Sequence, residues 1–167
     1  LQGATELSWT IDQVLETGQA VQLVDLSARS VVDMLHDDRL DLGTVYFRYD
    51  RQIKIISGEP EQVALAVDEI LAAIPEELSL DGNYPNPFNP VTTIRFGVPE
   101  PREVRISVVN ILGQEITELV NGWRDMGRHE VVWQGLDRTG KPVATGMYFT
   151  VLSDGNKIIV KKMLLLK

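Results

Sequence analysis

The chain has 167 residues, a formal net charge of −8 and 44% hydrophobic residues, which suffices for one large domain or two small ones. It contains no cysteine, so disulfides and thiol chemistry are excluded. Residues 1–79 carry 15 acidic and 5 basic side chains, whereas residues 80–167 carry 9 acidic and 11 basic. This shift predicts two separate units, and the acidic first part disfavours nucleic acid or an anionic membrane as a partner.

The first unit, residues 1–58, is predicted to be β-rich. Strand-like runs occur at 7–11, 20–26, 30–35, 44–49 and 52–57, with turns at 16–18 and 36–41. These strands are few for an independent domain, so we expect the later part of an immunoglobulin-like module. The sequence starts at Leu1 without an initiator methionine or a signal peptide, which predicts a piece of a longer protein.

Residues 59–79 are predicted to form a helix and a linker. Val63, Val67, Ile70, Leu71 and Ile74 recur at the spacing of one helix face, over a helix of residues 60–73. A proline in the first turn and early glutamates favour the start of this helix. The apolar stripe could bind a partner, but ordinary helix patterning favours packing on a neighbouring sheet.

A proline-rich stretch follows the linker and has a constrained backbone. Its residues are Asn83-Tyr84-Pro85-Asn86-Pro87-Phe88-Asn89-Pro90, which we call the proline motif. Each proline fixes its own φ and pushes the preceding residue toward extended conformations. The asparagine amides can bond to the local backbone. We therefore expect an ordered segment with Phe88 as its apolar anchor.

The remainder of the chain reads as short strands separated by turns. Strands are predicted near 78–80 and at 91–98, 103–112, 114–120, 129–133, 147–152 and 157–165. The intervening Asn-Gly, Asp-Gly and Gly-containing segments are hairpin and turn signals. The predicted fold class is all-β, with residues 80–167 forming a two-sheet, immunoglobulin-like β-sandwich.

The second half also carries an ordered series of longer motifs. They are the proline motif with Val-Thr-Thr-Ile (91–94), Val-Val-Asn-Ile-Leu-Gly-Gln-Glu (108–115), Leu-Val-Asn-Gly (119–122), Val-Val-Trp-Gln-Gly (131–135), Ala-Thr-Gly-Met-Tyr-Phe (144–149) and Lys-Lys-Met-Leu-Leu-Leu-Lys (161–167). This series resembles the type A C-terminal sorting domain of the type IX secretion system. Residues 133–148 also resemble the immunoglobulin-like domain of flagellar hook-capping proteins, but function does not follow from fold.

The resemblance to the sorting domain implies a route and partners. The protein would cross the inner membrane by a signal peptide, be recognised by the outer-membrane type IX translocon, and be cut by its sorting protease. The cargo would then be released or anchored at the cell surface. The sorting residues that we predict are Pro85, Asn86, Pro87, Phe88, Asn89 and Pro90 for the shape of the motif, Gly113, Gly127, Gly140 and Gly146 for turns, Tyr148, and Lys161, Lys162 and Lys167 for recognition.

Catalytic and metal-binding patterns are missing from the sequence. The two histidines, His36 and His129, have no metal-ligand spacing, and no Gly-x-Ser-x-Gly elbow is present. The acidic residues at 37, 38 and 41 could bind calcium, but a solvated turn is favoured because the EF-hand pattern is absent. Asp137 is likewise expected in a turn. We expect a monomer that is not an enzyme and binds no cofactor or metal.

The sequence leaves a second class of function open, a structural stalk or an adhesive, carbohydrate-binding module. Trp9, Trp123, Trp133 and Tyr148 could line a sugar-stacking face. However, Trp133 and Tyr148 lie inside apolar runs, where large aromatics usually fill the core. The terminal apolar run is too short for a membrane-spanning helix and is expected to be a strand with a recognisable edge.

Overall fold

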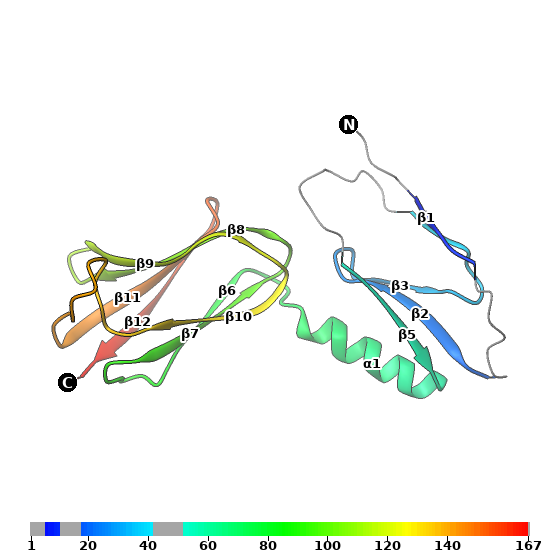
Figure 1. The fold of residues 1–167 in the computed structure, drawn as a ribbon, viewed down its shortest axis with the longest axis horizontal. Helices are drawn as coiled ribbons and strands as arrows, with labels where there is room; N and C mark the ends of the chain where they lie inside the picture. Colours follow the sequence, from blue (N-terminus) through cyan, green and yellow to red (C-terminus); the bar gives the residue numbers. More distant parts are fainter. Residues whose placement is uncertain (1–5, 11–17, 42–51, 167) are drawn as a thin grey trace. The chain divides into compact units, whose positions relative to one another are not determined.

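The computed structural model describes residues 6–10, 18–41 and 52–166, and the chain divides into two compact units, Leu1–Ala73 and Ile74–Lys167 (Figure 1). The division falls inside the segment 59–79, which the sequence predicts as a helix and linker. The helix α1 (Pro60–Ala73) contacts the sheet of the first unit, so it is grouped with that unit. The structural boundary therefore follows the helix directly.

The described part of the first unit combines small sheets with one helix. Strands β2 (Ala20–Asp25), β3 (Ser30–Asp33) and β5 (Ile53–Gly58) form an antiparallel sheet in the order β3-β2-β5. Strands β1 (Glu6–Ser8) and β4 (Arg39–Asp41) form a separate antiparallel pair. Helix α1 contacts β2 and β5 and buries Val63 and Val67. Its apolar stripe therefore packs on a sheet, as helix patterning favours.

One expectation for the first unit needs correction. The segment 36–41 is predicted as a turn, but its second half is strand β4, because residues 39–41 pair with residues 6–8. The described residues form a sheet with a helix packed on it and a separate strand pair, and the expected immunoglobulin-like module over residues 1–58 stays a prediction. The predicted strand at 44–49 lies outside the described residues.

The second unit is a sandwich of two antiparallel sheets. One sheet has the order β10-β7-β6 and the other has the order β12-β11-β8-β9. Its strands are β6 (Ser79–Tyr84), β7 (Thr92–Val98), β8 (Arg102–Asn110), β9 (Glu115–Arg124), β10 (Gly127–Trp133), β11 (Gly146–Ser153) and β12 (Ile158–Leu165). All seven strands predicted from the sequence are present, and the all-β sandwich is confirmed.

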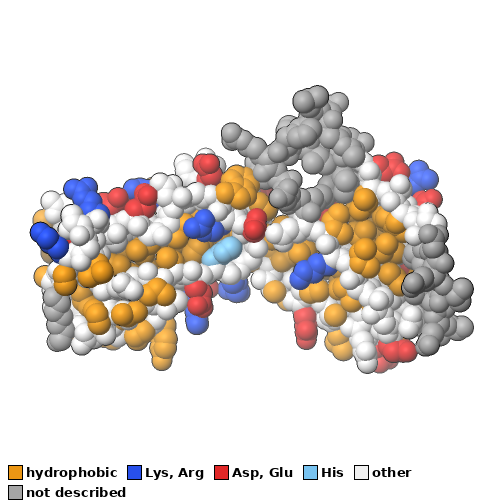
Figure 2. Space-filling model, viewed as in Figure 1, with side chains coloured by type: hydrophobic (Ala, Val, Ile, Leu, Met, Phe, Trp, Pro, Cys, Tyr) orange, Lys and Arg blue, Asp and Glu red, His pale blue; other side chains and the backbone are white. Residues whose placement is uncertain are grey.

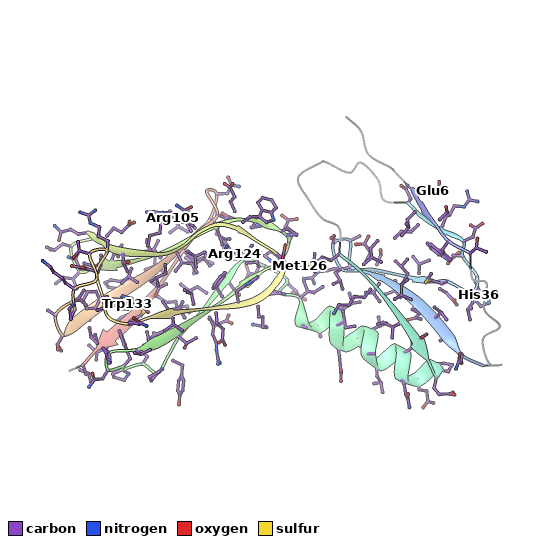
Figure 3. All side chains as sticks on the ribbon, in the orientation of Figure 1. Glu6, His36, Arg105, Arg124, Met126 and Trp133 are labelled. Atoms are coloured by element: carbon purple, nitrogen blue, oxygen red, sulfur yellow. The ribbon has the colours of Figure 1, made fainter. Side chains whose placement is uncertain are left out.

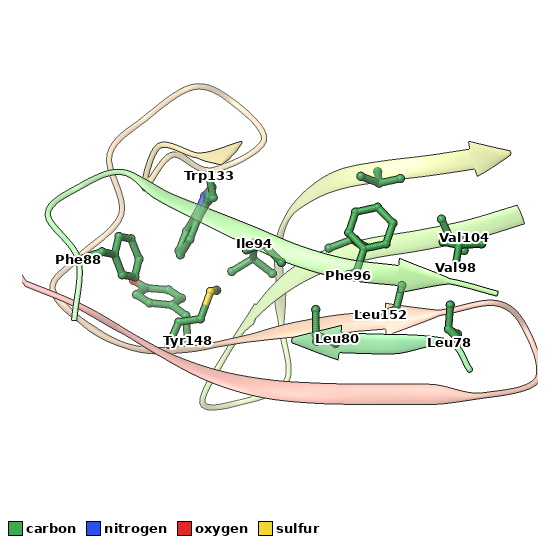
Figure 4. Close-up of a cluster of buried hydrophobic side chains, with 14 of the residues drawn as sticks. Leu78, Leu80, Phe88, Ile94, Phe96, Val98, Val104, Trp133, Tyr148 and Leu152 are labelled. Atoms are coloured by element: carbon green, nitrogen blue, oxygen red, sulfur yellow. The ribbon is translucent and has the colours of Figure 1, made fainter. Parts of the chain in front are cut away.

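The core of the sandwich is formed by alternate side chains of facing strands, as shown in Figure 4. On β7, Ile94 and Phe96 are buried, whereas Arg95 between them is exposed and pairs with Glu130 of β10 at 2.8 Å. On β8, Val104 and Ile106 are also buried. This period of two is what the alternation in the sequence predicts. The side chains at the alternate positions lie on the outer faces of the two sheets and take no part in this core.

Candidate recognition site

The proline motif packs against the last strand of the sandwich. The Phe88 side chain is buried, with 2% of its surface exposed. The Phe88 N–H donates to the carbonyl of Leu164 (3.0 Å), and the Phe88 carbonyl accepts from the N–H of Leu166 (2.9 Å). Phe88 therefore forms a short parallel bridge with Leu165. The predicted role of Phe88 as the anchor of the motif is confirmed.

Asn86 holds the same strand with its side chain. Its Nδ2 donates to the carbonyl of Lys162 (3.3 Å), and its Oδ1 accepts from the N–H of Leu164 (3.0 Å). The expectation that the asparagines bond to local backbone holds for Asn83, whose Nδ2 donates to the Pro85 carbonyl (3.0 Å), but is wrong for Asn86. The reason is that β12 is an edge strand, so its outward N–H and C=O groups need partners that a primary amide can supply.

An aromatic cluster encloses the buried ring of Phe88. The Phe88 and Trp133 ring centroids are 5.5 Å apart, and those of Trp133 and Tyr148 are 5.3 Å apart (Figure 4). The Trp133 Nε1–H donates to the Leu136 carbonyl (2.9 Å), and the Tyr148 hydroxyl donates to the Ala144 carbonyl (2.7 Å). Burial raises the pKa of Tyr148. Trp133 and Tyr148 thus belong to the core, and the sugar-stacking face that would need them is not formed.

The β8–β9 turn is fixed by Asn110, a residue that the sequence reasoning missed. Its Oδ1 accepts from the N–H groups of Leu112 and Gln114, both at 3.0 Å, and its Nδ2 donates to the Gln114 side chain (2.8 Å). Gly113 follows with a φ of 75°, a left-handed conformation that favours glycine. An asparagine three residues before a glycine is the signal that could have identified this turn.

Asp137 organises the turn between Trp133 and Tyr148. Its Oδ1 accepts from the Thr139 hydroxyl (2.8 Å), the Thr139 N–H (2.8 Å) and the Lys141 N–H (3.0 Å). The Thr139 hydroxyl and then the Lys141 N–H hold the pKa of this carboxyl below its usual range. The expectation that Asp137 is a turn residue is confirmed. The predicted glycines Gly127, Gly140 and Gly146 also have positive φ values, of 128°, 81° and 158°.

The predicted lysines do not form one cluster. Lys161 and Lys162 are both exposed, and consecutive strand residues point to opposite faces of a sheet. Lys162 lies opposite Phe149 of β11 and Lys161 lies opposite the buried Thr150. Within the described residues neither lysine forms an ion pair. Lys167 lies outside the described residues.

Segments far apart in the sequence meet at one end of the sandwich. They are the proline motif, the turn 110–114, the loop 135–146 and the strand end 164–166, and we call this end the motif end. The N–H of Arg138 donates to the Ile116 carbonyl, which connects the loop 135–146 to the start of β9. Asn110 lies opposite Tyr148, which connects the turn 110–114 to β11. In Figure 1 it is the end at which the β12 arrow terminates. Most of the sequence motifs therefore contribute to one surface.

The described residues offer little else for chemistry. Across the ranges that the structure describes, no three His, Asp or Glu side chains gather as metal ligands would. In the acidic segment of the first unit, Asp38 pairs with Arg39 at 3.0 Å. The Nδ1 of His36, which Figure 3 labels, lies 2.7 Å from Asp33. None of the helices in this part of the chain is both long enough and apolar enough to span a bilayer.

Comparison with known proteins identifies the second unit. The model of the secretion system C-terminal sorting domain matches residues 83–166, half of the chain. No curated relative matches by sequence. Two solved structures from Porphyromonas gingivalis are similar, PorZ, described as a surface component of the type IX secretion system, and dimeric latent PorU.

The likeness to these structures is limited. PorZ is 18% identical over 55% of this chain and 12% of its own, with a TM-score of 0.38. PorU is 12% identical over 92% of this chain and 17% of its own, with a TM-score of 0.43. The chain thus spans less than a fifth of either protein, and the family match carries the identification. The chain belongs to the family of secretion system C-terminal sorting domains, and its second unit is the type IX sorting signal of a protein exported to the cell surface or medium.

Proposed function

We propose that the motif end, together with Lys161 and Lys162, is the part of the chain that the outer-membrane type IX translocon recognises before its sorting protease acts. The observation that carries this proposal is the docking of the proline motif on β12 through Asn86 and Phe88. Sequence motifs some 80 residues apart thereby share one rigid surface. A recognition surface of this kind exists only when the domain is folded.

We also propose that the chain acts as a sorting signal in monomeric form and catalyses no reaction itself. Both histidines are engaged in local structure, which supports this reading. His36 lies against Asp33, and the His129 Nε2 lies 2.8 Å from the Asp125 carbonyl while its ring stacks on Phe96. Hydrolysis of peptide or glycoside substrates by the purified chain would contradict the proposal, as would a dimer in analytical ultracentrifugation.

The experiment fuses the whole chain behind a signal peptide and a fluorescent reporter in a type IX-competent bacterium. We expect reporter at the surface or in the medium, and retention in the periplasm of a translocon-deficient strain. Replacing Lys161, Lys162 and Lys167 by alanine is expected to reduce export without unfolding the domain, because the two lysines that the structure describes are exposed. Lys54→Ala, at an exposed lysine of the first unit, is the control. Equal retention of the unmodified fusion in both strains would instead favour a structural module.

A further inference from the structure

Two large apolar side chains at the motif end are presented to solvent by a rigid turn. Ile111 and Leu112 are 70% and 75% exposed. The turn that carries them is held by the Asn110 side chain and by backbone bonds from Asn110 to Gln114 and from Gly113 to Asn110, both 3.0 Å. Neither side chain contributes to the core, so stability of the fold does not explain them. Exposed apolar residues in a fixed geometry are typical of interaction sites.

The outer face of the β12-β11-β8-β9 sheet continues this apolar character on one half only. On the β8–β9 half, Arg105, which Figure 3 labels, bonds to both Glu115 and Glu118 at 2.6 Å, so its guanidinium is already paired with carboxylates. On the β11–β12 half, Met147 and Leu164 form a cross-strand pair and are 42% and 36% exposed. This pair lies next to the Asn110–Tyr148 pair, from which the Ile111–Leu112 turn begins.

Among the described residues, the same half-face also carries a positive charge that is paired with no carboxylate. Successive outward positions of β12 are Val160, Lys162 and Leu164, and Val160 is 51% exposed. Lys162 lies opposite the half-buried Phe149 and forms no ion pair within the described residues. A hydrophobic surface with one unmatched ammonium is complementary to an apolar surface that contains a carboxylate.

We propose that Ile111, Leu112, Met147, Val160, Leu164 and Lys162 form a docking surface for an apolar protein surface bearing an acidic side chain, on the outer-membrane translocon. This inference rests on the proposed function and specifies which face of the sorting domain is bound. Ile111 and Leu112 are the apolar anchors, and Lys162 pairs with the acidic group and fixes the orientation.

A protein partner fits these features better than a lipid surface or a second copy of this chain. Adsorption to an anionic membrane requires several basic residues close together, and among the described residues the outward positions of β12 present one lysine without an ion pair. The turn is held in one shape, which reduces the entropy cost of binding to a surface of matching shape. A second copy would present the same lysine, so a symmetric contact centred on Lys162 would place like charges together.

The test measures binding of the whole chain to detergent-solubilised type IX translocon, and export of the reporter fusion in parallel. The double variant Ile111→Ser/Leu112→Ser is expected to weaken binding about tenfold or more, equivalent to about 1.4 kcal/mol, and to reduce export. The matched control Ile55→Ser/Leu65→Ser removes apolar side chains of the first unit that are 63% and 65% exposed, and is expected to change neither quantity. Lys162→Arg is expected to bind normally and Lys162→Glu to bind at least about tenfold more weakly, because the charge sets the pairing.

Each alternative gives a distinct result. Unchanged binding by the Ile111→Ser/Leu112→Ser variant, with normal binding and export of the unmodified chain, would overturn this surface and leave the proposed function intact. Failure of the unmodified chain to bind or to be exported would overturn both. Cosedimentation of the chain with phosphatidylglycerol vesicles, or a dimer, that is abolished by the same variant would assign the surface to lipid or to a second copy instead. An unchanged thermal transition in the variant shows that the domain is folded.

Discussion

Replacing Phe88 by alanine tests the anchoring of the proline motif. The ring is 2% exposed and lies against Trp133. Its neighbours Trp133 and Tyr148 are fixed by their own hydrogen bonds to Leu136 and Ala144, so the cavity cannot readily collapse. Removing a buried phenylalanine costs about 3–5 kcal/mol when the site does not relax. The backbone bonds of residue 88 survive in alanine, so the loss comes from the side chain alone.

The assay is scanning calorimetry of the whole chain, following the transition of the second unit. A loss of about 3–4 kcal/mol corresponds to a decrease in Tm on the order of 15–25 °C for a domain of this size. Tyr84→Ala is the control, because Tyr84 belongs to the same motif and is 75% exposed. Its effect should remain within about 0.5 kcal/mol. A Phe88→Ala transition that matches the Tyr84→Ala transition would refute the anchoring argument.

Three further predictions address other contacts of the second unit. The backbone N–H of Lys157 is the main cause that lowers the pKa of Asp154, which also binds Arg102 at 2.7 Å. A carboxyl group whose pKa is lower in the folded state stabilises the fold when it is ionised, at pH values above its pKa in the unfolded chain, about 3.9. This stabilisation is lost as the pH falls through the pKa of the folded state. Asp154→Asn should therefore cost about 1.5–3 kcal/mol in urea unfolding at pH 7 and progressively less below about pH 4, and a constant cost would contradict this. Asn86→Ala should lower the free energy of unfolding by about 1–2 kcal/mol and speed hydrogen exchange at the Leu164 N–H, which donates to the Asn86 side chain. Unchanged exchange at Leu164 would show that this side chain does not hold the strand. A Cβ at Gly97 would lie 2.6 Å from the Ser79 Oγ and 2.8 Å from the ring of Pro75. Gly97→Ala should therefore lower the free energy of unfolding by about 1–3 kcal/mol. An unchanged free energy of unfolding would mean that Ser79 and Pro75 can move aside at little cost.

The strands of the second unit could be predicted because their signals are local. Alternation places Ile94 and Phe96 on one face and Arg95 on the other. The turn expected at Asn121-Gly122 is wrong, because β9 continues through these residues to Arg124 by pairing with β8. The helix was predictable for the same reason, since its stripe recurs at a fixed spacing. In the first unit, strand β4 depends on pairing with residues 6–8, some 30 positions away. No local sequence pattern predicts a strand pairing over this distance.

The candidate site was only partly predictable. The burial of Phe88 follows from its apolar character inside a constrained segment. The partner of Asn86 could not be deduced, because the β12 backbone that it binds lies 76 to 78 residues away and its need for a partner follows from the strand being at an edge. The sequence assigns recognition to Lys161 and Lys162 together, but the strand period sends their side chains to opposite faces. The sequence places Ile111 and Leu112 in the predicted strand 103–112, but β8 ends at Asn110 and the side chain of Asn110 builds the turn that exposes them.

The contacts of Asn86 and Phe88 explain why recognition of the proposed surface would depend on folding. The outward edge of β12 would otherwise present unpaired N–H and C=O groups, which favour aggregation. The proline motif covers this edge beside Lys162, Leu164 and Leu166. The same contacts fix the position of Leu164 and hence the apolar half-face next to it. A partner that binds this half-face therefore distinguishes a folded domain from an unfolded chain, because only folding brings the end of β12 and the turn at Ile111 and Leu112 to the same end of one sheet.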